Sequence, residues 1–454
     1  MTLQETPVEL TRGAARSSGP SVQDILDRER VPVPEVLRRT SYYYMGSDDL
    51  AKERYYAREF HDLEVEKMWT KTWLMACREE EIPDVGDHVV FGIADYSLIV
   101  VRSGVGKIQA FYNSCLHKGT QLRASGGTVA EFRCPFHGWT WKLDGSFREM
   151  PCGWDFEHVD PREFRLPEPL VDTWGGYVFV NMDRDAMPLR DYLGDLTEHM
   201  QRWPPENRWM YAHVARVIHC NWKIALEAFL EAYHVVATHP QTLLSLADEN
   251  SQYDIYPGQD HFTRIISVTG VPSPHIVYEI SEQDVQDNAR ENFMTETTQV
   301  PDGQTALQVI AEAVRAQMAA VGFDVSGITD VETNSAIQYH VFPNFLMMGP
   351  TTFRMRPNGN DPDSCIMELY VLADLPPGAE RPPAAPIHWL RPDQSWTDAP
   401  ELGMFGPILD QDTANMPRVQ TGLHTSMKPG VTLGNYQDIR IRHYHKTIDK
   451  YLAI

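Results

Sequence analysis

The chain has 454 residues, 42% of them hydrophobic and 10% aromatic, which is enough for large buried cores in two or three domains. Its formal net charge of −23 argues against nucleic acid or an anionic membrane as a partner, and is also typical of a highly soluble protein. No stretch approaches the roughly 20 apolar residues of a membrane span, and the first residues lack the apolar core of a signal peptide. The six cysteines are not spaced as a disulfide framework, so we expect a cytoplasmic globular protein.

The first part of the chain predicts an arm followed by a small β domain. Residues 1–54 are polar and interrupted by prolines, with one short helix that Ser21 should cap. A further short helix is expected to precede the β-rich segments 88–93, 96–102 and 107–113. The Asp144-Gly145 pair predicts a hairpin turn. Residues 55–165 are therefore expected to form an antiparallel β domain.

Residues 166–454 predict a second, larger domain. The run from Tyr177 to Asn181 predicts its first strand. Further strands are expected at 210–220, 261–269, 337–348 and 364–373, and helices at 221–236, 305–321, 406–424 and 435–452. The predicted fold class is therefore α+β, with a small β domain preceding a larger mixed domain.

Two short pairs of metal-binding residue types stand in the small domain, in the pattern C-x-H-x16-C-x-x-H: Cys115 with His117, and Cys134 with His137. A [2Fe–2S] cluster with two thiolates on one iron and two imidazoles on the other needs these four ligands. Gly119 and Gly138 follow the pairs and allow tight turns that point backbone N–H groups at the sulfurs. Structural zinc is the rival interpretation, but its histidines usually stand together rather than one in each pair.

A second constellation lies in and after the predicted helix 221–236. Glu227, Glu231 and His234 stand at positions i, i+4 and i+7, on one face of an ideal helix. His239, which precedes a proline, can approach His234 only if the helix loosens or ends between them. Two imidazoles and one carboxylate with open positions form the site of non-haem Fe(II) oxygenases. Spacing alone leaves several distant carboxylates as candidates, among them Asp398, Asp410 and Asp412.

The first motif resembles that of the large (alpha) subunit of Rieske non-haem iron oxygenases of the ring-hydroxylating type. The family patterns C-x-H-R-G and C-P-Y-H-G-W are close to CLHKG at 115–119 and CPFHGW at 134–139. Lys118 replaces the family's arginine, which alters any hydrogen bond that a planar guanidinium would make there. The resemblance implies a Rieske-type [2Fe–2S] cluster held by Cys115, His117, Cys134 and His137.

The second constellation resembles the same family. Its pattern N-W-K followed by D-x2-H-x4-H matches from Asn221 to His239, with Glu231 where most members have aspartate. The family has an aspartate eight residues before the glutamine of a V-Q-x-G-L segment, which matches here at 419–423 and points to Asp412. The resemblance implies a mononuclear Fe(II) held by His234, His239 and Asp412.

The resemblance also implies an architecture, partners and a reaction. A Rieske β domain would be joined to a helix-grip catalytic domain with an antiparallel sheet. Electrons would come from a separate ferredoxin, an NAD(P)H-dependent reductase or both, because the chain lacks a dinucleotide-binding or phosphate-binding loop. Family alpha subunits form rings of three, with or without a small beta subunit, and the acid matching Glu231 links a cluster histidine of one chain to an iron histidine of the next. The substrates expected are aromatic or polycyclic and are hydroxylated or demethylated with O2, although some members acting on quaternary ammonium compounds carry glutamate at this position.

The expected substrate pocket is apolar and adaptable. The residues that match its family segments are Phe229, Leu230, Phe345, Met347 and Met348, for which core packing is an equally good interpretation. A Rieske electron carrier without catalysis is the rival function, but it leaves the second constellation unexplained. A ferritin-like di-iron enzyme needs two Glu-x-x-His helices, and this chain offers one, from Glu231 to His234.

Overall fold

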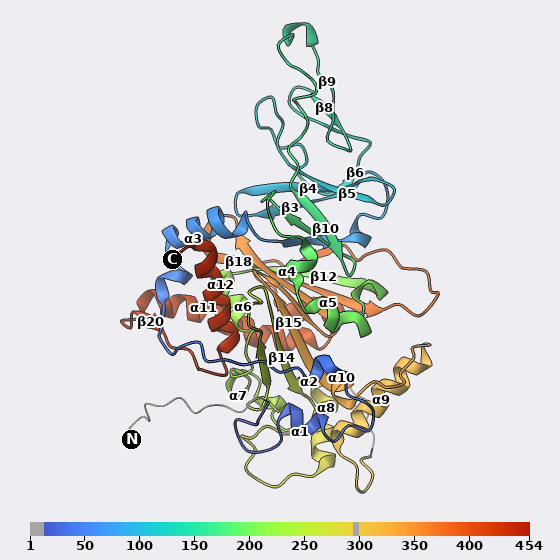
Figure 1. Cartoon of the computed structure of the whole chain (residues 1–454), viewed down its shortest axis with the longest axis vertical. Coiled ribbons are helices and arrows are strands. Elements are labelled where there is room, and N and C mark those ends of the chain that lie inside the picture. Colours follow the sequence, from blue (N-terminus) through green and yellow to red (C-terminus); the bar gives the residue numbers. More distant parts are fainter. Residues whose placement is uncertain (1–12, 294–298) are drawn as a thin grey trace.

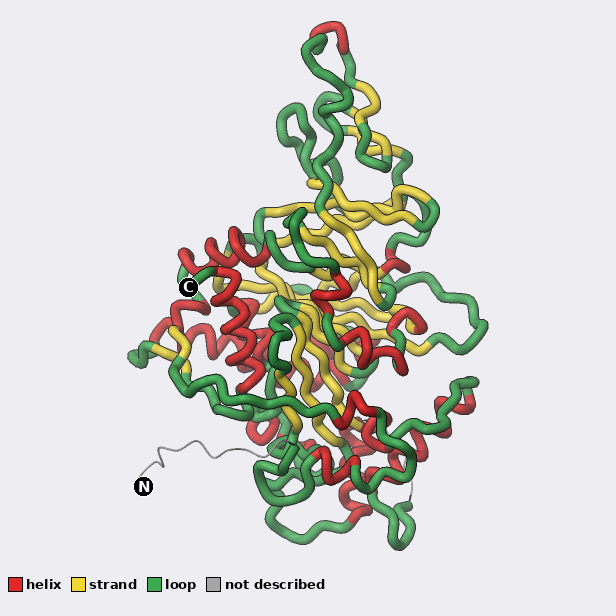
Figure 2. Tube along the Cα trace, viewed as in Figure 1, coloured by secondary structure: helices red, strands yellow, loops and turns green. Residues whose placement is uncertain are grey.

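The computed structural model describes residues 13–293 and 299–454, so residues 1–12 of the predicted arm fall outside the described part. The molecule is elongated, with a small β-rich part at one end and a larger part of sheet and helices at the other (Figure 1). Figure 2 shows the strands of the larger part at its centre, with helices around them. Within the described ranges, no helix is both long enough and apolar enough to cross a membrane.

The N-terminal segment lies along the larger part and contributes to its core. Ser21 caps α1 (Val22–Leu26) in a capping box with Asp24, which confirms the predicted cap. Apolar residues of α1 and of α2 (Glu35–Arg38) pack against β14 (Phe262–Val268) and α9 (Ala306–Ala320). Further along, β1 (Leu50–Ala51) pairs with β20 (Gly430–Val431). The segment is therefore held to the larger part at both of its ends.

The small part begins with α3 (Arg58–Glu64) and a π-helical turn, and antiparallel sheets follow them in the chain. One sheet has the order β5-β4-β3-β6 and another the order β7-β8-β9. Their strands are β3 (Asp87–Ile93), β4 (Tyr96–Gly104), β5 (Lys107–Tyr112), β6 (Gly127–Thr128), β7 (Glu131–Arg133), β8 (Thr140–Lys142) and β9 (Phe147–Glu149). The three β-rich segments predicted from the sequence are thereby confirmed.

The predicted hairpin at Asp144-Gly145 joins β8 to β9. Gly145 has a φ of +80°, and an added Cβ would stand 2.4 Å from the ring of Phe111. The carboxylate of Asp144 accepts a hydrogen bond of 2.9 Å from the N–H group of Ser146. Because Phe111 belongs to β5, this turn fixes the second sheet against the first.

A third sheet connects the small part to the rest of the chain. Its order is β10-β11-β2, and its strands are β2 (Leu74–Arg78), β10 (Leu170–Trp174) and β11 (Tyr177–Asn181). β11, which confirms the strand predicted there, pairs with β2 across the expected domain boundary at residue 165. The division into 55–165 and 166–454 therefore stays a prediction, and strand pairing associates β10 and β11 with the small part.

The larger part is built on an eight-stranded sheet of order β13-β14-β15-β16-β17-β18-β12-β19. Neighbouring strands of this sheet are antiparallel, except that β12 and β19 are parallel. The sheet is therefore mixed, whereas the sequence predicted an antiparallel one. Besides β14, its strands are β12 (Arg208–Ile218), β13 (Gln252–Ile255), β15 (Ser335–Val341), β16 (Phe345–Met348), β17 (Thr351–Asn358), β18 (Asp361–Asp374) and β19 (Ile387–Trp389). The predicted strand 337–348 is thus two strands joined by a turn, and the sequence did not predict β13, β17 or β19.

Helices pack on both faces of this sheet. One face is covered by α6 (Trp222–Glu227), α11 (Phe405–Thr425) and α12 (Ile439–Leu452), around the largest apolar core. The other face packs against α4 (Leu189–Leu193), α5 (Leu196–His199) and the sheet that contains β2 and β11. At the end away from the small part, α8 (Glu282–Phe293), α9 and α10 (Asp330–Asn334) lie near α1 (Figure 1).

The predicted helix 221–236 is interrupted, which corrects the expectation of one continuous helical face. α6 and α7 (Val235–Thr238) are separated by residues 228–234. Buried groups bind the backbone of this segment: Arg440 donates to the carbonyl of Leu230 at 3.3 Å, and the hydroxyl of Tyr253 accepts a backbone N–H at 2.9 Å. These tertiary contacts satisfy backbone groups that a helix would otherwise pair, so local periodicity did not decide the structure here.

Candidate metal centres

The two Cys–His pairs of the small part lie on two loops of the same construction. One loop follows β5, and the other joins β7 to β8. In each loop, the N–H group four residues after the cysteine donates to the cysteine carbonyl: Gly119 to Cys115 at 2.8 Å, and Gly138 to Cys134 at 3.1 Å. Both glycines have a φ of +76°, so the tight turns expected from the sequence are present.

The four side chains converge between these loops. The two cysteines are 3% and 2% exposed, and the rings of His117 and His137 lie 4.6 Å apart. His117 also stacks on Trp139 at 5.1 Å, and its buried Nδ1 finds no hydrogen-bond partner among the described residues. A buried nitrogen without a partner, beside a second imidazole and two buried thiols, fits a cluster with two nitrogen and two sulfur ligands.

Backbone N–H groups face both sulfurs. Those of Phe136 and His137 point at Cys134, and the equivalent groups of the other loop point at Cys115. Burial raises the pKa of the Cys115 thiol above its ordinary value. Burial acts in the same direction on Cys134, but the N–H groups hold the pKa of that thiol below its ordinary value. Such donors stabilise thiolate, the form in which cysteine binds iron.

The second set of donors comes from the ends of α7 and from α11. His234 precedes α7 and His239 follows it, so one short helix joins the two histidines, whereas the predicted helix already ends at Glu227. Nε2 of His239 lies 2.8 Å from Oδ1 of Asp412, and Nε2 of His234 lies 3.7 Å from the same atom. One ligand atom from each of the three residues lies within 4.8 Å of the others. Two nitrogens and one carboxylate on one side fit a mononuclear iron with open positions.

The other two carboxylates named by spacing have different partners. Asp410 accepts the N–H group of Trp396 at 2.7 Å, and Asp398 accepts the N–H group of Ser395 at 2.7 Å. Both therefore cap a short turn that precedes α11. Of the three candidates, Asp412 is the one that the fold brings to the histidines.

Each imidazole of this site is oriented through its Nδ1. Oε1 of Glu231 lies 2.7 Å from Nδ1 of His234, and Oε1 of Gln411 accepts a hydrogen bond of 2.8 Å from Nδ1 of His239. Burial acts to lower the pKa of His234, but the hydrogen bond and charge of Glu231 hold it above its ordinary value. A donating Nδ1 leaves Nε2 free to bind a metal. Sequence reasoning predicted Glu231 as a partner of His234 but did not predict Gln411 as a partner of His239. The position of Gln411 next to Asp412 could have indicated this role.

A cavity of about 400 Å³ opens beside these donors. His234, His239 and Asp412 line it, and so do Phe229 and Met348 from the predicted pocket set. Its remaining walls come mainly from β14, β15, α9 and the start of α11, including Ile265, Gln338, Ile310, Val314, Phe405 and Ile408. The α11 residues stand about one or two turns before Asp412, so helical spacing could have predicted them.

The other three residues of the predicted pocket set lie in cores. Side chains alternate along β16, so Phe345 and Met347 point away from the cavity and pack with Tyr177 of β11. Leu230 is fully buried in the core beneath α6. For these residues, the alternative interpretation of core packing describes the structure.

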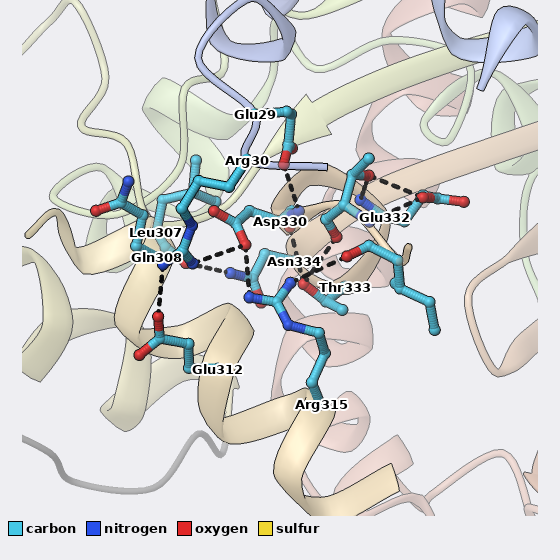
Figure 3. A network of polar contacts seen from close by, with 12 residues as sticks. Glu29, Arg30, Leu307, Gln308, Glu312, Arg315, Asp330, Glu332, Thr333 and Asn334 are labelled. Carbon is cyan, nitrogen blue, oxygen red and sulfur yellow. Dashed lines mark hydrogen bonds and ion pairs between the residues drawn. The ribbon is translucent and has the colours of Figure 1, made fainter. Parts of the chain in front are cut away.

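A polar network fixes the wall that α9 contributes to the cavity (Figure 3). Arg315 of α9 and Arg30 of the N-terminal segment both contact Asp330 of α10, at 2.7 and 3.5 Å. Asp330 is largely buried, which strengthens its pairing with Arg315 relative to a surface ion pair. Because Ile310 and Val314 project from the same helix into the cavity, the network holds this wall in place.

Comparison with known proteins gives the family of the chain. Residues 195–454 match the model of the ring hydroxylating alpha subunit (catalytic domain), and residues 72–158 match that of the Rieske [2Fe-2S] domain. The chain is 30% identical over 231 residues to the glycine betaine monooxygenase oxygenase subunit of Pseudomonas aeruginosa, covering 50% of this chain and 52% of the relative. It is 32% identical over 198 residues to the anthranilate 1,2-dioxygenase large subunit of Acinetobacter baylyi, covering 42% of each.

The matches to these curated relatives thus span about half of their length or less. Among solved structures, naphthalene 1,2-dioxygenase from Rhodococcus sp. has a TM-score of 0.60 and 22% identity, covering 89% of this chain and 94% of that chain. This likeness concerns the fold alone. The matched Rieske domain contains both Cys–His loops, and the matched catalytic domain contains the His–His–Asp set. The chain therefore belongs to the Rieske non-haem iron oxygenases, as an alpha subunit of the ring-hydroxylating type.

Proposed function

We propose that this chain is the oxygenase component of a Rieske oxygenase system, which oxygenates a largely apolar ring compound with O2 and electrons from a separate reductase or ferredoxin. The observation that carries the proposal is the presence of two metal-donor sets in one chain, the second of which lines a cavity of about 400 Å³. An electron carrier needs the first set, but it needs neither the second set nor a cavity beside it. The rival function therefore leaves most of the larger part unexplained.

The proposed roles follow from the donor chemistry. A [2Fe–2S] cluster on Cys115, His117, Cys134 and His137 would supply single electrons, and Fe(II) on His234, His239 and Asp412 would supply the O2 chemistry. Glu231 and Gln411 hold the two imidazoles with Nε2 turned toward Asp412. The apolar walls exclude water and place the substrate next to the open side of the donors.

The lining of the cavity supports an uncharged substrate. None of the described residues that line it is lysine or arginine, so a substrate carboxylate would be buried without a direct counter-charge. The carboxylates that do line it, Glu231 and Asp412, belong to the donor side. Phe229, Met348 and Phe405 give the walls an apolar and adaptable character suited to aromatic rings.

A quaternary ammonium compound is the second candidate substrate. The similarity to the glycine betaine monooxygenase subunit and the glutamate at position 231 favour it. Sites for such cations usually place several aromatic faces around the methyl groups. Apart from histidine, the aromatic residues among the described lining are Phe229 and Phe405, which is why we rank this substrate second.

We also propose that electrons pass between neighbouring copies of the chain in a homotrimer. β8, which closely follows His137, and α7, which lies between the two iron-site histidines, are far apart along the long axis of the molecule (Figure 1). A head-to-tail arrangement of copies would bring the cluster of one chain to the iron site of the next. In such a ring, Glu231, already bonded to His234, would accept a hydrogen bond from a cluster histidine of the neighbour.

The experiment that tests the function is product formation from labelled oxygen. The cluster- and iron-loaded protein would be supplied with a ferredoxin, an NAD(P)H-dependent reductase and 18O2, together with either naphthalene or glycine betaine. We expect mass spectrometry to find 18O in a hydroxylated naphthalene product. The His234→Ala variant should retain the cluster absorbance but form no product.

Other outcomes would change the assignment. Demethylation of glycine betaine without any naphthalene product would establish the second candidate. Cluster reduction by the partners without a product from either compound would contradict the proposed function and favour the electron carrier.

A further inference from the structure

Gln338 presents an unused hydrogen-bond donor to the cavity. It lies on β15, paired with Ile265 of β14 and Met348 of β16, and all three residues line the cavity. Oε1 of Gln338 accepts a hydrogen bond of 2.7 Å from Nη1 of Arg440. Because a guanidinium group only donates hydrogen bonds, this contact fixes the amide with its oxygen toward Arg440 and its nitrogen away from it.

Arg440 is a buried cation that bonds to neutral groups. Besides Gln338, it donates to the hydroxyl of Thr263 at 3.0 Å and to the carbonyls of Phe229 and Leu230. Its Nη2 finds no partner among the described residues. Burial lowers the pKa of Arg440 to about 9, so the side chain remains charged at neutral pH. Its positive charge is therefore not cancelled by a bonded carboxylate.

The charge of Arg440 acts on the cavity through the amide of Gln338. A hydrogen bond from a cation polarises the amide and makes its N–H groups stronger donors. Within the described part of the chain, Gln338 is 5% exposed and makes one side-chain hydrogen bond, which its Oε1 accepts from Arg440, so its Nε2 donates to no protein group. Nε2 of Gln338 is not among the buried polar atoms that lack a partner, so it is open to water, which a substrate acceptor would displace. The cavity is the space from which that acceptor can come.

We infer that Nε2 of Gln338 binds an oxygen atom of the substrate, so that the cavity selects apolar ring compounds that carry a carbonyl group over the corresponding hydrocarbons. The inference rests on this cavity being the substrate site of the proposed function. A carbonyl oxygen only accepts hydrogen bonds and matches the amide N–H2 group directly. An alcohol also brings a proton that needs its own acceptor, and a carboxylate would bury a full charge against one neutral donor. Gln338 thereby determines which ring atoms face His234, His239 and Asp412.

Direct binding of a matched ligand series tests this role without turnover. Isothermal titration calorimetry of the cluster- and iron-loaded protein would use tetralin, 1-tetralone and 1-tetralol, which share one ring system. We expect the wild-type protein to bind 1-tetralone about tenfold more tightly than tetralin, with 1-tetralol between them. The absence of this preference, or of binding by all three compounds, would overturn the inference.

Two variants of Gln338 make the test specific. Gln338→Met keeps the length and removes the donor, so 1-tetralone and tetralin should bind equally. Gln338→Glu keeps a partner for Arg440, which protects the fold, and turns an acceptor toward the cavity. In this variant 1-tetralone should bind more weakly than tetralin, while 1-tetralol should keep its affinity. The neighbouring Met348→Leu substitution serves as the control, because it should change the three affinities alike.

The results separate this inference from the proposed function. A ketone preference that persists in Gln338→Met or Gln338→Glu would overturn the role of the amide. Labelled naphthalene product without a ketone preference would support the proposed function and contradict the role of the Gln338 amide. A ketone preference that Gln338→Met abolishes, without any labelled product, would support the role of the amide in binding and contradict the proposed oxygenase function.

Discussion

Nε2 of His239 lies 2.8 Å from Oδ1 of Asp412, although 173 residues separate them in the chain. α11 carries Asp412 to the end of α7, after the chain has formed most of the eight-stranded sheet between the two residues. The proposed iron donors are therefore assembled by tertiary packing. Changes at this site should affect metal binding separately from the cluster, whose donors come from two loops of the small part.

Replacing Asp412 should remove the mononuclear iron and spare the cluster. Among the described residues, Asp412 supplies the carboxylate that faces both histidines, and Asp412→Ala deletes it. We expect metal analysis to show loss of the mononuclear iron, with the visible absorbance of the cluster unchanged. Asp410→Ala, two residues earlier, is the matched control: it should keep the iron but cost roughly 1 kcal/mol of stability, since it uncaps the turn at Trp396. Equal iron contents in the two variants would contradict the assignment of Asp412.

Gln411 should tune iron affinity through His239. Its Oε1 accepts the hydrogen bond of His239 Nδ1, so Gln411→Leu leaves this ring without its partner. We expect the affinity for Fe(II), measured by competition with a chelator, to fall about 10-fold to 100-fold. Gln411→Glu should keep the affinity, because it retains an acceptor at the same position. A Leu variant that binds iron as tightly as the wild type would exclude this role.

Lys223 should act in stability and not in iron binding. Its Nζ lies 2.6 Å from Oε1 of Glu64, and both side chains are fully buried. Lys223→Met would leave the Glu64 charge buried without a cation, which should destabilise the protein by about 3–5 kcal/mol. The double variant Lys223→Met/Glu64→Gln should recover most of this loss in urea unfolding, because no lone charge remains. Failure of the second substitution to restore stability would show that the ion pair is not the cause.

Glu227 should make stability fall as pH rises. Burial raises the pKa of Glu227 to about 8 despite its hydrogen bond from Tyr55, whereas an unfolded glutamate titrates near 4.5. Between these two values the folded protein holds a proton that the unfolded chain releases, so this group favours unfolding increasingly as pH rises from about 4.5 to about 8. Glu227→Gln should leave the free energy of unfolding nearly unchanged near pH 4.5 and raise it by a few kcal/mol near pH 8. A difference in melting temperature that does not change with pH would contradict this.

The sequence predicts the elements whose pattern is local. The Asp144-Gly145 turn, the cap at Ser21 and the strands of the small part follow from side-chain alternation and turn chemistry, and the structure contains them. Residues 228–234 depart from the helical pattern because Arg440 and Tyr253 bind their backbone, and those contacts come from distant elements. A parallel edge strand such as β19 depends on a long return of the chain that no local pattern encodes.

The candidate sites divide in the same way. The Cys–His loops can be predicted because each ligand pair and its turn lie within five residues, as Cys115 and Gly119 show. Asp412 follows from the family resemblance, since spacing left other carboxylates open. Gln411, Gln338 and the α9 wall depend on which side chains meet in space. Along β16, one residue of offset separates Met348 at the cavity from Met347 in a core.

The central claim is that the cluster of one copy supplies the iron site of the next, and mixed rings of two inactive variants test it most directly. Cys115→Ser should lack the cluster and keep the iron site, whereas His234→Ala should keep the cluster and lack the iron. Any mixed ring of three contains one junction at which an intact cluster precedes an intact iron site, so rings purified by tags on both chains should regain about one third of wild-type turnover. Mixed rings that remain as inactive as either variant alone would contradict transfer between copies.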